Sequence, residues 1–154
     1  MKLFCVVMAL ACGSATLAGN GVPYPKENVA EFVVERLDVT TLPSTIRPKP
    51  EKRKKTFGDY GFTTLRPGEK GGLVEAMPGG LRIHIRILEQ KTSGIYVCVE
   101  REDKDASNER VQDVVLLRWK EANGLLKGTR TFKEFEGCPV VGTDPDSGSD
   151  SYGG

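Results

Sequence analysis

Two neighbouring stretches alternate apolar and polar residues, and this alternation constrains the fold more than any other feature of the chain. Residues 81–88 read LRIHIRIL and residues 95–101 read IYVCVER, separated by the turn-forming Thr92-Ser93-Gly94. Side chains of an extended strand point alternately to opposite faces of a sheet. The pattern therefore predicts two strands that share one buried layer, formed by Ile83, Ile85, Ile87, Ile95, Val97 and Val99.

Four further segments are typical of strands: residues 60–65, 73–77, 111–120 and 125–135. Pro78-Gly79-Gly80 predicts a turn after the second of these. Residues 111–120 also fit a helix, since Val111, Val115 and Trp119 recur at helical spacing, but the continuous apolar run favours a buried strand. We expect an all-β fold, a small antiparallel sandwich or barrel.

A short amphipathic helix is predicted before the strands. Residues 26–37 (KENVAEFVVERL) place Val29, Val33 and Leu37 at i, i+4 and i+8, although the Val33-Val34 pair leaves a strand open. Residues 19–55 are interpreted as this helix plus a Pro-rich basic linker, and residues 56–141 as the β-rich domain. Residues 142–154 have almost no apolar content and are predicted to be a disordered tail.

Residues 1–18 have the anatomy of a secretory signal peptide. Lys2 precedes a ten-residue apolar run, and small residues follow it. The run is too short to span a bilayer, and no later run approaches that length. We expect cleavage after Ala18, with Ala15 as the alternative, and a secreted, extracellular protein without a membrane span.

The cysteines predict one disulfide. Cys5 and Cys12 leave with the signal peptide, whereas Cys98 and Cys138 remain, 40 positions apart. An even pair in an oxidising compartment favours a bridge between them over two free thiols. An intermolecular bridge and a metal pair are the alternatives. Two cysteines and one histidine make a poor zinc set, so we expect neither a metal nor a cofactor.

The charge balance argues against nucleic acid as a partner. The chain carries 22 Lys and Arg residues against 21 Asp and Glu residues, and loss of Lys2 makes the two equal. A nucleic-acid-binding domain would show a basic excess.

No constellation of an enzyme is visible in the sequence. His84 is the only histidine, and no nucleophile elbow accompanies it. With Arg82 and Arg86 it forms either a cationic strip for a polyanion or, as we favour, the solvated face of a sheet. Residues 103–109 resemble the first half of a calcium loop, but Asn108 stands at the sixth position, where glycine is needed. A solvated loop is favoured there.

One segment concentrates positive charge. Residues 47–55 (RPKPEKRKK) hold one acid and six basic residues, namely Arg47, Lys49, Lys52, Arg53, Lys54 and Lys55. Three hypotheses remain open for this segment: a solvated linker, a site for a processing endoprotease, and a site for a sulfated glycan or another polyanion.

The spacing of apolar residues, Gly94, Tyr96 and Cys98 within residues 83–98 resembles the stretch from strand E to strand F of immunoglobulin-like domains. In that family a Tyr two residues before the Cys forms the tyrosine corner. The resemblance implies a β-sandwich in which Tyr96 has this role. No cysteine precedes Cys98 in the mature chain, so the family's bridge between its two sheets is not implied.

Together these observations predict a secreted, non-enzymatic extracellular binding or structural protein with one disulfide. Its partners would be an extracellular protein or matrix component, or a sulfated glycan. The alternative is a secreted precursor, cleaved at residues 52–55 to release a cytokine-like or hormone-like C-terminal domain. Nothing in the sequence specifically supports a third hypothesis, a protease inhibitor.

Overall fold

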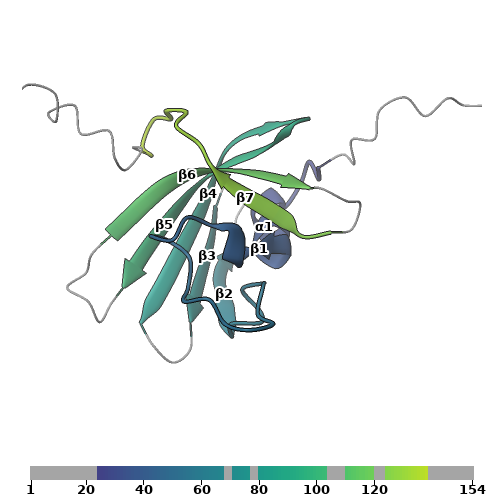
Figure 1. The fold of residues 1–154 in the computed structure, drawn as a ribbon. Helices are drawn as coiled ribbons and strands as arrows, with labels where there is room; N and C mark the ends of the chain where they lie inside the picture. Colours follow the sequence, from purple (N-terminus) through teal and green to yellow (C-terminus); the bar gives the residue numbers. More distant parts are fainter. Residues whose placement is uncertain (1–23, 68–70, 77–79, 104–109, 120–123, 139–154) are drawn as a thin grey trace, which may run out of the picture.

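The described strands of the protein form one strongly curved sheet, shaped like half a barrel (Figure 1). The computed structural model describes residues 24–67, 71–76, 80–103, 110–119 and 124–138. The elements are α1 (Val29–Arg36), β1 (Leu37–Asp38), the 3-10 helix η1 (Val39–Thr41), β2 (Phe62–Pro67), β3 (Gly71–Ala76), β4 (Leu81–Lys91), β5 (Gly94–Asp103), β6 (Arg110–Trp119) and β7 (Leu126–Arg130). Residues 1–18 and 142–154, predicted to be a signal peptide and a tail, lie outside the described residues.

The strand order is β1-β7-β6-β5-β4-β3-β2, and every neighbouring pair is antiparallel except β1 with β7. The prediction of an all-β fold with a short N-terminal helix is confirmed. Residues 111–119, most of the segment whose spacing also fits a helix, belong to strand β6. Within the described part of the chain there is one sheet, with β1 and β2 at its edges, and no second sheet of a sandwich.

The β4–β5 hairpin forms the middle of the core, as the alternation predicts. Ile85 pairs with Val99, and Ile87 pairs with Val97. Five of the six predicted residues are fully buried in one cluster, and Ile87 packs against it partly buried. We call the face that carries these side chains the core face, and the opposite face of the sheet the outer face. Gly94 at the turn has φ +152°, and a Cβ there would meet the Leu117 carbonyl oxygen at 2.6 Å, so the position requires glycine.

Helix α1 packs on the core face against β2, β3 and β4. Its buried residues are Val29, Ala30, Val33 and Val34, the apolar stripe expected of an amphipathic helix. The helix approaches β3 closely at Gly72, where a Cβ would lie 3.0 Å from Val34 Cγ2. The lack of a side chain at Gly72 therefore lets the helix lie on the sheet.

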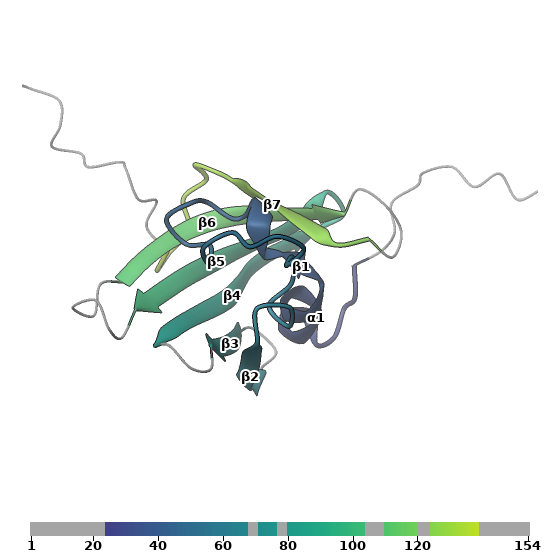
Figure 2. The same cartoon turned by 60° about the horizontal axis from the view of Figure 1, so that its bottom comes forward.

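The Pro-rich segment after β1 also belongs to this core. Leu42, Ile46 and Phe57 are at most 2% exposed and share one cluster with α1 and the strands. Figure 2 shows the segment running close to the sheet between η1 and β2. The segment interpreted as a linker therefore packs against the sheet, because apolar residues placed between its prolines and charges reach the core.

Candidate functional site

The basic segment, Arg47–Lys55, is held at both ends by buried residues. Ile46 is buried before it and Pro48 near its start, and Phe57 is buried after it, with its ring 5.2 Å from that of Phe62. The Arg47 carbonyl oxygen accepts a hydrogen bond from Arg101 Nη1 at 3.2 Å, and Val39 N donates to the Lys55 carbonyl oxygen at 2.8 Å. The segment is thus a fixed loop on the folded domain.

A turn lies at the tip of this loop. Lys54 N donates to the Glu51 carbonyl oxygen at 3.3 Å, and Arg53 has φ +71°, an unusual value for a residue with a side chain. Glu51 N donates to Tyr60 Oη at 3.0 Å. Lys54 Nζ lies 2.8 Å from a Glu51 carboxylate oxygen and 5.3 Å from the centre of the Tyr60 ring. We call residues 51–54 the basic turn.

Asp59 closes the C-terminal end of the loop. One of its carboxylate oxygens accepts hydrogen bonds from Thr56 N at 2.8 Å and from Lys55 N at 2.9 Å, and Thr56 Oγ1 accepts one from Asp59 N. These bonds to the ionised carboxylate, chiefly that from Thr56 N, lower the pKa of Asp59.

The six basic side chains divide into two groups. Arg47 and Lys54 serve the loop itself, since Arg47 Nη1 donates to the Thr40 carbonyl oxygen at 3.1 Å and Lys54 pairs with Glu51. The other four are exposed, and none forms an ion pair with another described residue: Lys49, Lys52, Arg53 and Lys55. These four side chains form the candidate site for an anionic ligand.

The outer face carries the predicted strip of Arg82, His84 and Arg86, but acids of the neighbouring strand lie beside its first two members. Arg82 lies 3.5 Å from Glu102, and His84 is exposed and directly opposite Glu100. Arg110 of β6 lies 3.6 Å from both of these glutamates. This ladder of opposite charges favours the interpretation of a solvated sheet face.

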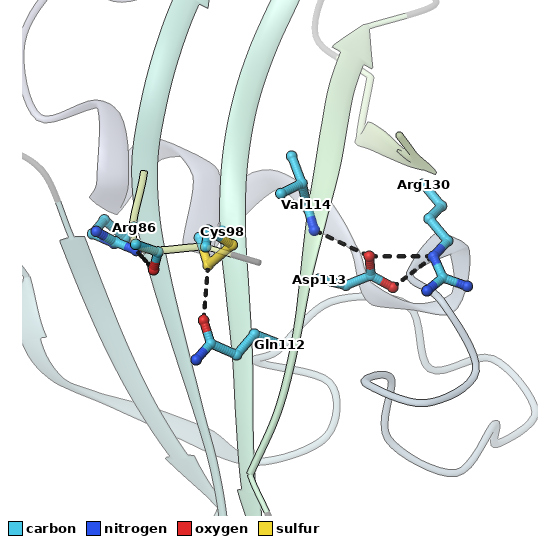
Figure 3. The surroundings of a disulfide bond; sticks show 8 residues. Arg86, Cys98, Gln112, Asp113, Val114 and Arg130 are labelled. Carbon is cyan, nitrogen blue, oxygen red and sulfur yellow. Dashed lines mark hydrogen bonds and ion pairs between the residues drawn. A yellow bond between two sulfur atoms is a disulfide. The ribbon is translucent and has the colours of Figure 1, made fainter. Parts of the chain in front are cut away.

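The predicted disulfide is confirmed and lies on the outer face. Cys98 of β5 is bonded to Cys138, with 5.9 Å between their Cα atoms (Figure 3). The bridge packs with the buried Val114 in a small second cluster. Gln112 Oε1 lies 3.7 Å from Cys98 Sγ, a contact without a hydrogen bond because the bridged sulfur carries no proton.

Residues 131–138 lie against the outer face around the disulfide. The Phe135 ring lies 5.4 Å from that of Tyr96, and Arg86 Nη2 donates to the Gly137 carbonyl oxygen at 2.5 Å. Lys133 pairs with Glu89 and lies 4.6 Å from the centres of both the Tyr96 and the Phe135 ring. Because this lysine already lies over both rings, we interpret the cluster as an attachment of the C-terminal segment and not as a ligand site.

A buried ion pair on the core face was not anticipated from the sequence. Asp113 is fully buried, and Arg130 Nε lies 3.2 Å from its Oδ1 and 2.9 Å from its Oδ2 (Figure 3). Val114 N donates to Oδ1 at 3.1 Å, whereas Oδ2 has the ion pair without an aligned hydrogen bond. Burial raises the pKa of Asp113, and Arg130 opposes this increase. An aspartate within the apolar run of residues 111–117 was the signal available in the sequence.

Residues 104–109, most of the calcium-like loop, lie outside the residues that the structure describes. Among the residues that are described, no group of three or more His, Cys, Asp or Glu residues is placed to hold a metal ion. In the same part of the chain, no helix is long and apolar enough to cross a membrane.

Comparisons of this chain with protein-family models, curated proteins and solved structures give no match. Residues 83–98 lie on β4 and β5, and their resemblance to immunoglobulin-like domains stays a prediction.

Proposed function

We propose that this protein is a secreted, non-enzymatic extracellular binding protein with one disulfide, and that its basic segment binds sulfated glycans of the extracellular matrix. The observation that carries the proposal is the exposure of Lys49, Lys52, Arg53 and Lys55 on a loop fixed at both ends. Sulfate groups repeat along such a glycan, so several cations close together in the chain engage it at once.

The fixed backbone supports a binding role. Ile46 and Phe57 anchor the loop in the core, and Asp59 and Tyr60 hold its backbone amides. A loop that is already ordered loses less conformational entropy on binding than a flexible arm. The loop therefore presents its lysines and arginine to a ligand at a small entropic cost.

The charge distribution on the sheet also supports this choice. On the outer face, Arg82 and Arg110 lie beside Glu100 and Glu102. In the basic segment, one acid faces six basic residues, and that acid pairs with Lys54. The basic segment is thus the stronger candidate for an anionic partner.

The test is retention on immobilised heparin, a sulfated glycan, with elution by salt. Substitution of glutamine for all four exposed residues, K49Q/K52Q/R53Q/K55Q, should abolish retention, because each lost cation removes a contact that releases counterions. The control is K26Q/R36Q/R118Q/K127Q, which removes the same charge from other exposed positions. Equal elution of the two variants would contradict the proposal.

The second candidate, a precursor that releases a C-terminal domain, requires the two sides of the basic segment to separate. Helix α1, strand β1 and Ile46 lie on the N-terminal side and share one core with the sheet, which favours the binding proposal. The intact mass of the naturally secreted protein distinguishes the two, since a released domain would begin at or near Lys54 or Thr56.

A further inference from the structure

We propose that the basic turn, Glu51–Lys54, is a proteolytic modification site. An extracellular protease specific for basic residues would cleave the folded protein there, and the two resulting chains would stay associated. The reaction is hydrolysis of one peptide bond, between Lys52 and Arg53 or between Arg53 and Lys54. Water supplies the hydroxyl of the new carboxyl group and a proton for the new amino group.

The turn is an exposed basic position that few hydrogen bonds hold in place. Lys52 and Arg53 are exposed, and the hydrogen bonds that hold their turn are those of Lys54 N with the Glu51 carbonyl oxygen and of Glu51 N with Tyr60 Oη. Both bonds lie at the surface, so they exchange readily for bonds to water. Opening the turn also relieves the positive φ of Arg53. The chain can therefore become extended, as a protease requires, without disturbing the core.

The other described basic residues are less suitable. Ten lie in helix α1 or in strands, where cleavage requires the loss of helical or ladder hydrogen bonds: Arg36, Arg66, Arg82, Arg86, Lys91, Arg101, Arg110, Arg118, Lys127 and Arg130. Arg47 and Lys49 precede prolines, whose bonds proteases of this specificity cut poorly. Lys55 is bonded through both its amide and its carbonyl group, to Asp59 and Val39. Lys26 and Lys133 remain as competitors, and the experiment below includes them.

The two chains would stay together because the N-terminal chain is part of the core. It supplies buried residues from α1 through the loop: Val29, Ala30, Val33, Val34, Leu37, Val39, Leu42 and Ile46. Leu37 pairs with Leu126 of β7, Thr41 Oγ1 accepts from Gly128 N at 2.7 Å, and the Phe32 ring stacks on Trp119 at 5.2 Å.

The association would not depend on the disulfide. Cys98 and Cys138 both lie on the C-terminal side of the turn. The cleaved form is therefore a non-covalent complex that separates only when the domain unfolds. A free C-terminal domain is not its product.

Cleavage would also regulate ligand binding, a step that rests on the proposed function. It places Lys52 and Arg53 at or beside new chain ends, where they are no longer fixed on one turn. The new carboxylate and the new ammonium group nearly cancel in charge, so the loss of the fixed arrangement is what weakens binding. A bound sulfated glycan covers the same side chains that the protease recognises. We therefore expect the glycan to protect the turn, and cleavage to weaken glycan binding.

The experiment is limited digestion of the secreted protein with a low amount of trypsin. The first cleavage should give a new N-terminus at Arg53 or Lys54 and two chains on a denaturing gel without reductant. Gel filtration of the same sample in native buffer should show one particle of unchanged size. Elution of the two chains as separate particles, or a first cut at Lys26, Lys133 or any other position, would overturn the proposal.

Two variants sharpen this result. K52Q/R53Q should resist the first cleavage, whereas K26Q/K127Q should be cut like the unchanged protein, and unfolding curves should show that both are folded. Preincubation with heparin tests the second step and should slow the cut. Cleavage into associated chains without protection by heparin would support the cleavage site and contradict glycan binding. Protection by heparin together with separation of the two chains would support glycan binding and contradict the proposal of a cleaved but associated protein.

Discussion

Truncation of Ile46 tests whether the Pro-rich segment belongs to the core. Ile46 is fully buried in the main cluster, and it lies between η1 and β2 in sequence. Ile46→Ala removes three carbon groups, and at about 0.8 kcal/mol each their transfer to water costs about 2.4 kcal/mol. The cavity left behind raises the expected loss to about 3 kcal/mol. For a domain of this size, that loss lowers the melting temperature by about 10 °C.

The assay is urea unfolding followed by tryptophan fluorescence, because the single Trp119 packs against the main cluster. Thr45→Ala is the matched control, since Thr45 is exposed and adjacent in the same segment. It should change the free energy of unfolding by less than about 0.5 kcal/mol. If Ile46→Ala and Thr45→Ala have the same midpoint, the segment is a linker and the packing argument is refuted.

Three further predictions follow from the core, the disulfide and the buried ion pair. Ile85→Asp or Val97→Asp should prevent soluble secretion, because both side chains are fully buried and an unpaired buried charge costs several kcal/mol. His84→Asp, on the exposed outer face, should be secreted at a yield near normal. Cys98→Ser should lower the free energy of unfolding by about 2–5 kcal/mol, and recovery of two alkylatable thiols from the native protein would contradict the bridge. Arg130→Met should destabilise the fold by about 1–3 kcal/mol at neutral pH, because it leaves the buried Asp113 carboxylate without its cation. The pKa of Asp113 is already raised and would rise further in this variant. The loss of unfolding free energy should therefore be smaller in acid, where Asp113 is protonated, than at neutral pH. A loss independent of pH would show that the ion pair does not cause it.

The alternation of apolar residues was sufficient to predict the hairpin of β4 and β5. Ile83, Ile85, Val97 and Val99 repeat with the period of a strand, and each is buried on the expected face. The helix was equally visible, because Val29 and Val33 recur at helical spacing. Strand β1 was not predicted, since its two residues are too short to show a period and their pairing with β7 is distant in sequence.

Packing between distant segments explains what the sequence alone did not predict. Ile46 stands in a stretch without periodicity, and nothing local indicates that it lies in the core. Residues 131–135 were expected to continue the last strand. In the structure β7 ends at Arg130, and Cys138 is bonded to Cys98 on the outer face. The disulfide pairing could be predicted from the cysteine count, but its position against Tyr96 and Phe135 could not.

The residues of the candidate site could be predicted from the sequence, but the arrangement of their side chains could not. Six clustered basic residues were evident from the sequence, whereas their division between support of the loop and exposure to solvent depends on tertiary contacts. Arg47 donates to the Thr40 carbonyl oxygen and Lys54 pairs with Glu51. Equivalent residue types in one run therefore have different roles because of what surrounds them.

The most direct test of glycan binding by the basic segment is the affinity for a defined heparin oligosaccharide, measured at increasing salt concentration. The unchanged protein should bind with an affinity that falls steeply with salt, because several cations release counterions on binding. K49Q/K52Q/R53Q/K55Q should lose both the affinity and most of the salt dependence, while K26Q/R36Q/R118Q/K127Q should keep both. If the two variants lose affinity equally, net charge and not the basic segment governs binding, and the account is contradicted.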